Sequence, residues 1–223
     1  MKKFSLCILL PTYNEKENIA WMIDHIRKSC QNEIIVSDEH SKDGTAGIAR
    51  AKGVRVYPRK TPGYGIGLQE SLVNAKKLGH THLLVMDCDR TYPISYIKKM
   101  EKEARKGYDL VNAGRRFRDI RLLTRMPNRF HTFLTRLLFG GNINDVNSGM
   151  KLMNVEKYIG KITFEGPPST MQTITVALKN NFKVKEIIIP YDDRSGDKSR
   201  GRSKIRVKDG FDIMMGILAE RVR

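Results

Sequence analysis

Short apolar runs alternate with segments of helical periodicity along the first half of the chain. The runs are continuous, as is typical of strands buried on both faces, and we expect strands at residues 4–10, 33–36, 54–57, 82–86 and 109–113. Apolar residues three and four positions apart predict helices between them, at Ile19, Met22, Ile23 and Ile26, at residues 45–52, at Leu68, Leu72 and Val73, and at residues 94–105. This alternation predicts an α/β fold with a mainly parallel, twisted sheet flanked by helices.

The second half of the chain is less regular. We expect an amphipathic helix carrying Phe130, Phe133, Leu134, Leu137 and Leu138, a helix at residues 169–180, a strand at residues 183–191, and a terminal helix carrying Val207, Phe211, Met214, Met215, Leu218 and Val222. The sequence shows no internal repeat and no low-complexity linker. We therefore interpret residues 1–223 as a single domain, in which residues from about 115 elaborate the regular half at about 1–114.

The charge of the chain is unusual for an ordinary hydrophobic content. Lys and Arg number 41 against 24 Asp and Glu, a net charge of +17, which favours anionic partners such as nucleic acid, acidic lipid headgroups or phosphate-rich small molecules. The three cysteines form no CxxC pair, as expected for reduced thiols in a cytoplasmic protein. No apolar stretch approaches the roughly 20 residues of a spanning helix. We expect a soluble protein, or at most one that lies on a membrane surface.

Four motifs follow one another in the loops after the expected strands. They are Leu10-Pro-Thr-Tyr-Asn-Glu15, Ser37-Asp-Glu-His-Ser-Lys-Asp-Gly-Thr45, Asp87-Cys-Asp89 and Asn147-Ser-Gly-Met-Lys151. Each alone is a weak signal, but in this order and spacing the chain resembles the family 2 glycosyltransferases, and within them the dolichol-phosphate (polyprenyl-phosphate) mannose synthase group. The resemblance runs from about residue 4 to about residue 206. It implies a GT-A-type fold and a nucleotide-sugar donor.

The pair Asp87 and Asp89 is a candidate metal site. Both carboxylates point the same way from a strand end, and hard oxygen ligands suit Mg²⁺ or Mn²⁺ that shares its coordination shell with substrate phosphates. Such a cation would neutralise the charge that develops on the departing nucleoside diphosphate. The alternative is that Asp89 merely caps the next helix.

The resemblance also implies which residues hold the donor. Pro11, Thr12, Tyr13 and Glu15 would cradle the nucleotide, together with Ser37, Glu39 and Cys88 of the next two motifs. The first loop could instead be a plain turn, since Asn14 and Glu17 have the spacing of a capping box. In the family an aspartate contacts the nucleotide base, and Glu39 stands in its place. Thr91 stands where mannose synthases often have a glutamine as a further ligand on the metal side. The donor could therefore be linked to GDP or UDP, and Arg90 could hold diphosphate charge.

Two basic clusters lie in the second half of the chain. Seven arginines and one acid fall within residues 115–136, and seven cations and one acid within residues 194–208. In the resemblance, Arg116, Arg129 and Ser148 lie on the acceptor side, whereas Arg200 and Lys204 belong to a loop over the donor. Arginine suits such sites because its planar fork binds phosphate oxygens in pairs. We assign catalytic roles to Asp89, Arg116 and Arg200.

The nature of the acceptor decides whether the enzyme needs a general base. Gln172 stands where relatives often carry a glutamate, and an amide cannot accept a proton. A phosphomonoester needs no base, because its second pKa is about 6. We therefore expect inverting transfer of a hexose, mannose or glucose, to a polyprenyl or dolichyl phosphate. A rival acceptor is a sugar or glycolipid hydroxyl, with Asp145 or Glu165 as the base.

Two further expectations concern surfaces. A non-enzymatic nucleic-acid-binding protein would explain the charge but not the motifs, so we expect no nucleic-acid partner. The apolar stripe of the terminal helix, widened by Ile213 and Ile217, directly follows the second basic cluster, a pattern typical of interfacial helices. This predicts a peripheral protein on the anionic, cytosolic face of a membrane. The alternative is that the stripe packs on the core.

Overall fold

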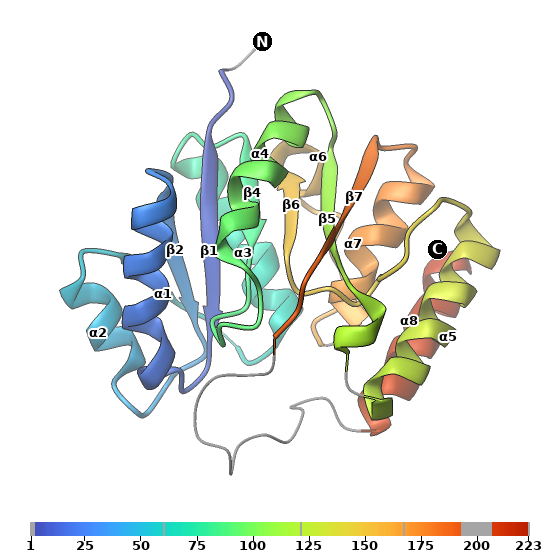
Figure 1. Cartoon of the computed structure of the whole chain (residues 1–223), viewed down its shortest axis with the longest axis horizontal. Coiled ribbons are helices and arrows are strands. Elements are labelled where there is room, and N and C mark those ends of the chain that lie inside the picture. The colour runs from blue at the N-terminus through green and yellow to red at the C-terminus, as the bar shows by residue number, and fades with distance from the viewer. Residues whose placement is uncertain (1–2, 60, 121, 167, 193–206, 223) are drawn as a thin grey trace.

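A seven-stranded sheet runs through the middle of the molecule (Figure 1). The computed structural model describes residues 3–59, 61–120, 122–166, 168–192 and 207–222, without the side chains of residues 123 and 207–209. The strands are β1 (Leu6–Thr12), β2 (Glu33–Asp38), β3 (Arg55–Pro58), β4 (His82–Val85), β5 (Leu110–Arg115), β6 (Lys151–Asn154) and β7 (Val184–Ile189). Their order in the sheet is β3-β2-β1-β4-β6-β5-β7.

Strand β6 is the one strand that the apolar pattern does not predict. It pairs antiparallel with β4 and with β5, whereas β1 pairs parallel with β2 and β4, β2 with β3, and β5 with β7. β6 has four residues and begins at Lys151, the last residue of the fourth motif, so no periodicity could develop. Its insertion joins β4, and with it β1, β2 and β3, to β5 and β7.

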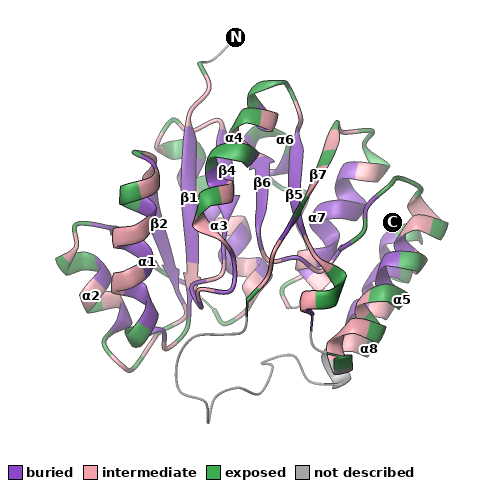
Figure 2. Cartoon of the chain, viewed as in Figure 1, coloured by how far each residue is buried: buried purple, intermediate pink, exposed green. Residues whose placement is uncertain are grey.

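Helices cover both faces of the sheet, as expected (Figures 1 and 2). On one face lie α1 (Lys16–Ser29), α2 (Thr45–Ala51) and α4 (Ile97–Arg105), and on the other α3 (Tyr64–Lys77), α6 (Val155–Tyr158) and α7 (Pro168–Lys179). Within β1, Ile8 and Leu10 pack in the first layer and Cys7 and Leu9 in the second, which is why the strand is apolar throughout.

Two further helices, α5 (Leu122–Phe139) and α8 (Val207–Val222), lie side by side beyond α7 (Figure 1). Short 3₁₀ turns precede α4 and α5, at η1 (Ile94–Tyr96) and η2 (Phe117–Asp119). Among the residues that the structure describes, no helix combines the length and apolar character needed to cross a bilayer.

The capping-box prediction for α1 is wrong. Glu15 occupies the N-cap position, and no side chain caps the helix there. Asn14 has a positive φ of 54°, and its Oδ1 accepts a hydrogen bond from the Lys42 amide at 2.9 Å while its own amide donates to Ser41 Oγ at 2.9 Å. Asn14 therefore fastens the first motif to the second instead of starting the helix.

Candidate active site

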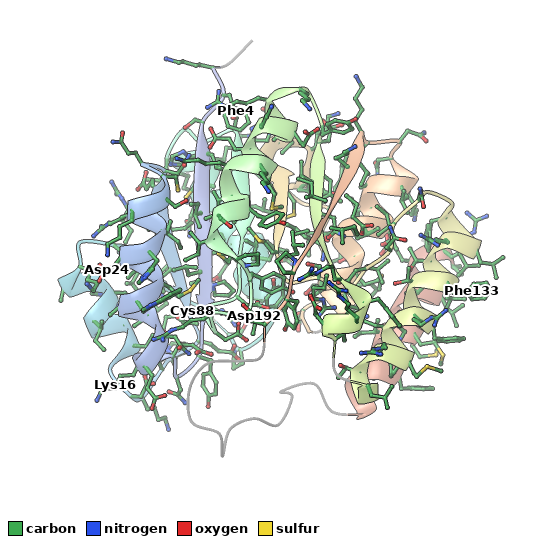
Figure 3. All side chains as sticks on the ribbon, viewed as in Figure 1. Phe4, Lys16, Asp24, Cys88, Phe133 and Asp192 are labelled. Carbon is green, nitrogen blue, oxygen red and sulfur yellow. The ribbon has the colours of Figure 1, made fainter. Side chains whose placement is uncertain are left out.

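The four motifs meet at one edge of the sheet. β1, β2 and β4 are parallel, so the loops that follow Thr12, Asp38 and Val85 leave the sheet at the same side. The segment after β7 reaches this edge too, because the Asp192 amide donates to the Thr91 carbonyl at 3.2 Å. Figure 3 shows Cys88 and Asp192 at this edge of the ribbon.

Thr91 and Gly149 lie against the acidic pair Asp89 and Asp87, respectively. Asp89 is buried, and its Oδ1 accepts hydrogen bonds from the Thr91 hydroxyl at 2.6 Å and from the Thr91 amide at 3.3 Å. At Gly149 of the fourth motif, a Cβ would overlap Asp87 Oδ2, so only glycine lets that backbone lie against the carboxylate. No side chain caps η1 or α4, so the alternative role of Asp89 as a helix cap is wrong.

The residues present fit a divalent cation bound together with a diphosphate. Asp87 and Asp89 supply hard oxygen ligands, and the described part of the chain contains no group of three or more His, Cys, Asp or Glu that could hold a metal alone. Such a cation would complete its shell with phosphate oxygens and water, as Mg²⁺ usually does. Thr91, in the place of the family's glutamine, donates its hydroxyl hydrogen to Asp89.

Glu39, which was expected to contact the nucleotide base, forms an ion pair with Arg59. Arg59 is only 3% exposed, and its Nε also donates to Ser37 Oγ at 3.2 Å. A Cβ at Gly67 of α3 would lie 2.5 Å from that Nε, so the glycine leaves room for the guanidinium. The sequence analysis missed Arg59, although a cation directly after β3 was a signal, since β3 ends at the same edge as β2.

The first motif contains both buried, hydrogen-bonded side chains and an exposed one. Thr12 is buried, and its hydroxyl donates to Asp38 Oδ1 at 2.9 Å. The Glu15 carboxylate is buried and accepts from Asn18 Nδ2 at 2.9 Å. Tyr13 is 49% exposed, which leaves its ring accessible for stacking, and Pro11 is partly buried. Donor contacts by these residues stay predictions.

An open basin of about 400 Å³ lies beside this edge. Its lining is mostly charged, comprising Arg116, Arg118, Asp119, Ile120, Leu122, Arg125, Tyr191 and Asp192. Asp119 Oδ2 accepts from Arg116 Nε at 2.9 Å and from the Tyr191 amide at 3.1 Å. Partial desolvation opposes ionisation of Asp119, but the Tyr191 amide and Arg116 outweigh it and lower the pKa. The basin therefore places arginines around Asp119, an acid that stays ionised.

Comparison with known proteins identifies the chain. The model of the family described as "Glycosyl transferase family 2" matches residues 7–160. The chain belongs to this family. It is similar to a dolichyl-phosphate hexose transferase of Haloferax volcanii, at 25% identity over 98% of this chain and 96% of that protein. It is also similar to the glycosyltransferase AglJ of the same organism, at 31% identity over 70% of this chain and 52% of the relative.

Solved structures confirm the GT-A fold of this family 2 glycosyltransferase. The crystal structure of glucosyl-3-phosphoglycerate synthase from Mycobacterium tuberculosis in complex with Mn²⁺, UDP-glucose and phosphoglyceric acid matches with a TM-score of 0.76. That match has 19% sequence identity and covers 98% of this chain and 80% of the other.

The arginines of the first basic cluster divide between the core and the surface of this glycosyltransferase. Arg116, Arg118 and Arg125 line the basin. Arg115 instead forms a bidentate pair with the buried Asp145, with nitrogen–oxygen distances of 2.6 and 2.9 Å, and its own side chain is only partly exposed. Burial opposes ionisation of Asp145, but Arg115 lowers the pKa of the carboxyl. This engagement gives Asp145 a structural role and argues against its use as a general base.

Arg129 lies on α5, outside the basin lining. It is exposed, and its guanidinium carbon lies 5.0 Å from the centroid of the Phe117 ring, which Arg125 approaches equally closely at 5.1 Å. Contact between Arg129 and an acceptor phosphate stays a prediction.

Three expected site residues occupy buried positions. Ser148 is fully buried and its Oγ donates to the Ala113 carbonyl at 2.6 Å, so it fastens the fourth motif to β5. The Cys88 side chain packs in the core, where burial raises its thiol pKa, so any donor contact there would come from the backbone. Ser37 Oγ faces Arg59. Arg200 and Lys204 lie outside the described residues.

Two further polar residues have positions that the sequence did not settle. Gln172 is buried, and its Oε1 accepts from the amides of Thr163 at 2.8 Å and Phe164 at 3.0 Å, so it braces a loop. The Arg90 guanidinium stacks on Trp21, 4.8 Å from the ring centroid, and donates to a carbonyl of α1. Asp192, by contrast, is an exposed acid in the basin that the sequence analysis did not single out.

Proposed function

We propose that this glycosyltransferase is an inverting, metal-dependent hexosyltransferase. It would move mannose or glucose from a GDP- or UDP-linked donor to a polyprenyl or dolichyl phosphate at an anionic membrane surface. The observation that carries the proposal is the basin beside the acidic pair, where Arg116, Arg118 and Arg125 gather around an acid that is already tied to Arg116. Guanidinium groups in such an arrangement suit a phosphomonoester.

The chemistry follows from the ionisation of that acceptor. A phosphomonoester with a second pKa of about 6 is largely dianionic at neutral pH and needs no proton removed. One of its oxygens forms a bond to C1 of the sugar while the bond from C1 to the donor's β-phosphate oxygen breaks. The electron pair leaves with the nucleoside diphosphate, and the configuration at C1 inverts. The arginines would hold the nucleophile in line and lower the repulsion between two anionic substrates.

The residues of the donor side would hold the leaving group. Asp87 and Asp89 would carry Mg²⁺ or Mn²⁺, which neutralises charge on the nucleoside diphosphate when bound. Tyr13 would stack on the base or ribose, and Glu15 would accept from ribose hydroxyls. Arg59, which pairs with Glu39, would present N–H donors to the nucleotide base of the donor. Arg200 and Lys204 complete the proposed donor contacts.

The relatives support this assignment. A relative of nearly equal length is named a dolichyl-phosphate hexose transferase, and the structural neighbour was crystallised with Mn²⁺, UDP-glucose and phosphoglyceric acid. Dolichyl phosphate and phosphoglyceric acid both carry a phosphate group, which is in keeping with the cationic acceptor site that we propose here.

One observation favours a second candidate, transfer to a sugar or glycolipid hydroxyl. Asp192 is an exposed carboxylate in the basin and could accept the hydroxyl proton. Glu165 is exposed as well, but it lies outside the basin lining.

The test compares polyprenyl phosphate with the corresponding polyprenol as acceptors for GDP-mannose, GDP-glucose and UDP-glucose, with Mn²⁺. We expect transfer to the phosphate alone, and we expect Asp192→Asn to keep its rate within a few-fold. Glu165→Gln is the matched control. Transfer to a hydroxyl acceptor that Asp192→Asn lowers by 10²-fold or more, the usual scale of general-base catalysis, would replace the phosphate acceptor by the hydroxyl one.

A further inference from the structure

Exposed apolar side chains concentrate on α5 and α8. Of thirteen exposed large hydrophobic residues in the described part of the chain, nine lie on these two helices. They are Leu122, Met126, Phe130, Phe133 and Leu137 on α5, and Phe211, Met215, Leu218 and Val222 on α8. Steps of three and four residues place each set on one helical stripe. Figure 3 shows Phe133 directed away from the body of the molecule.

Other faces of the same helices hold them to the fold. Ile213 and Ile217 of α8 are buried against Met171 of α7, and Leu134 and Leu138 of α5 pack against the same cluster. The two helices are also joined directly, since His131 Nε2 lies 3.0 Å from the Gly210 carbonyl oxygen. The expectation that the terminal helix packs on the core thus holds for the face that carries Ile213 and Ile217, whereas membrane contact of the other face stays a prediction. The exposed stripes are not needed for packing.

The charge around the stripes indicates what covers them. α5 contains Arg125, Arg129 and Arg136 and no acid, and seven cations lie at 194–208 in the sequence leading into α8. A second copy of this chain, also at +17, would bring the same cations together. An anionic lipid surface accepts apolar side chains and attracts the cations at the same time.

The basin opens onto the same helix. Leu122 and Arg125 line the basin, and Leu122 is also the first residue of the exposed stripe of α5. A surface that covers α5 would therefore lie next to the arginines of the acceptor site. A lipid phosphate could reach them without leaving the headgroup layer.

We propose that the exposed stripes of α5 and α8 together form a docking surface for an anionic lipid bilayer, with α5 seating the acceptor basin at the headgroups. The location of the surface is inferred from the exposure of these apolar side chains and from the charge of the neighbouring segments. Its role in presenting the acceptor rests on the proposed function.

Vesicle co-sedimentation of the full chain, without any substrate, tests the docking surface. Vesicles of phosphatidylcholine alone are compared with an equal mixture of phosphatidylcholine and phosphatidylglycerol. We expect binding to the anionic vesicles, weakened by salt, and a loss of about tenfold in partitioning for each of Phe130→Ser and Phe133→Ser. Val73→Ser, which removes an exposed apolar side chain from α3, is the matched control and should bind as wild type does.

Several results would overturn the proposal. Wild-type protein that ignores anionic vesicles, or phenylalanine variants that bind them as wild type does, would exclude this surface. A wild-type dimer in sedimentation equilibrium that Phe133→Ser converts to a monomer, without vesicle binding, would assign the face to a second copy. Met126→Ser serves as an independent variant if circular dichroism shows that a phenylalanine variant is unfolded. Transfer to detergent-dispersed polyprenyl phosphate is measured separately, so the proposed function can stand when docking fails.

Discussion

Replacing Thr91 by valine tests how the acidic pair is held. The Thr91 hydroxyl is buried and donates to Asp89 Oδ1 at 2.6 Å, and valine has nearly the same shape without the donor. Hydrogen bonds to charged groups contribute about 1.5–3 kcal/mol, which corresponds to roughly 10- to 100-fold in rate if the lost orientation acts on the transition state. We therefore expect Thr91→Val to lower kcat/KM by that factor and to weaken the apparent affinity for Mn²⁺.

The assay is steady-state transfer to polyprenyl phosphate across a Mn²⁺ titration. Thr91→Ser keeps the hydroxyl and is expected to restore most of the activity, which a purely steric role of Thr91 would not explain. Thr91→Val with wild-type kcat/KM and wild-type metal requirement would refute the idea that this hydroxyl positions Asp89.

Three more outcomes are expected. Asp89→Asn should lower kcat by about 10²–10³-fold with an unchanged melting temperature, and wild-type turnover surviving in excess EDTA would contradict the metal role. Arg116→Ala should raise the acceptor KM about tenfold with little change in the donor KM, and more than Arg129→Ala does, because only Arg116 lines the basin. Burial lowers the pKa of His82 from 6.5 to about 4, so the unfolded chain binds more protons between these values. The contribution of His82 to stability should be fully present above pH 6.5 and fall by about 3 kcal/mol towards pH 4 in urea titrations, and His82→Gln should reduce the measured slope by this contribution.

The strands and the catalytic edge could be predicted from the sequence because their signals are local. Continuous apolar runs marked β1, β2 and β4, and polar motifs followed each of them. Since parallel strands end at one edge, the motifs had to meet there. The acidic pair and the apolar stripe of α8 are likewise properties of short segments, readable without knowing what packs against them.

Partners that lie far apart in the chain were decided only by the tertiary structure. Arg115 and Arg116 are sequence neighbours, yet one pairs with the buried Asp145 and the other lines the open basin. No local pattern separates them, because the difference arises from what lies opposite each side chain in the folded chain.

The sequence by itself determined the fold class, the family and the edge of the sheet where the four motifs meet. Only the tertiary structure placed β6 between β4 and β5, paired Glu39 with Arg59, and brought Asp192 to Thr91. These contacts join segments separated by long stretches of chain. Their geometry depends on how the whole sheet assembles, whereas periodicity and motif spacing report only what neighbouring residues prefer.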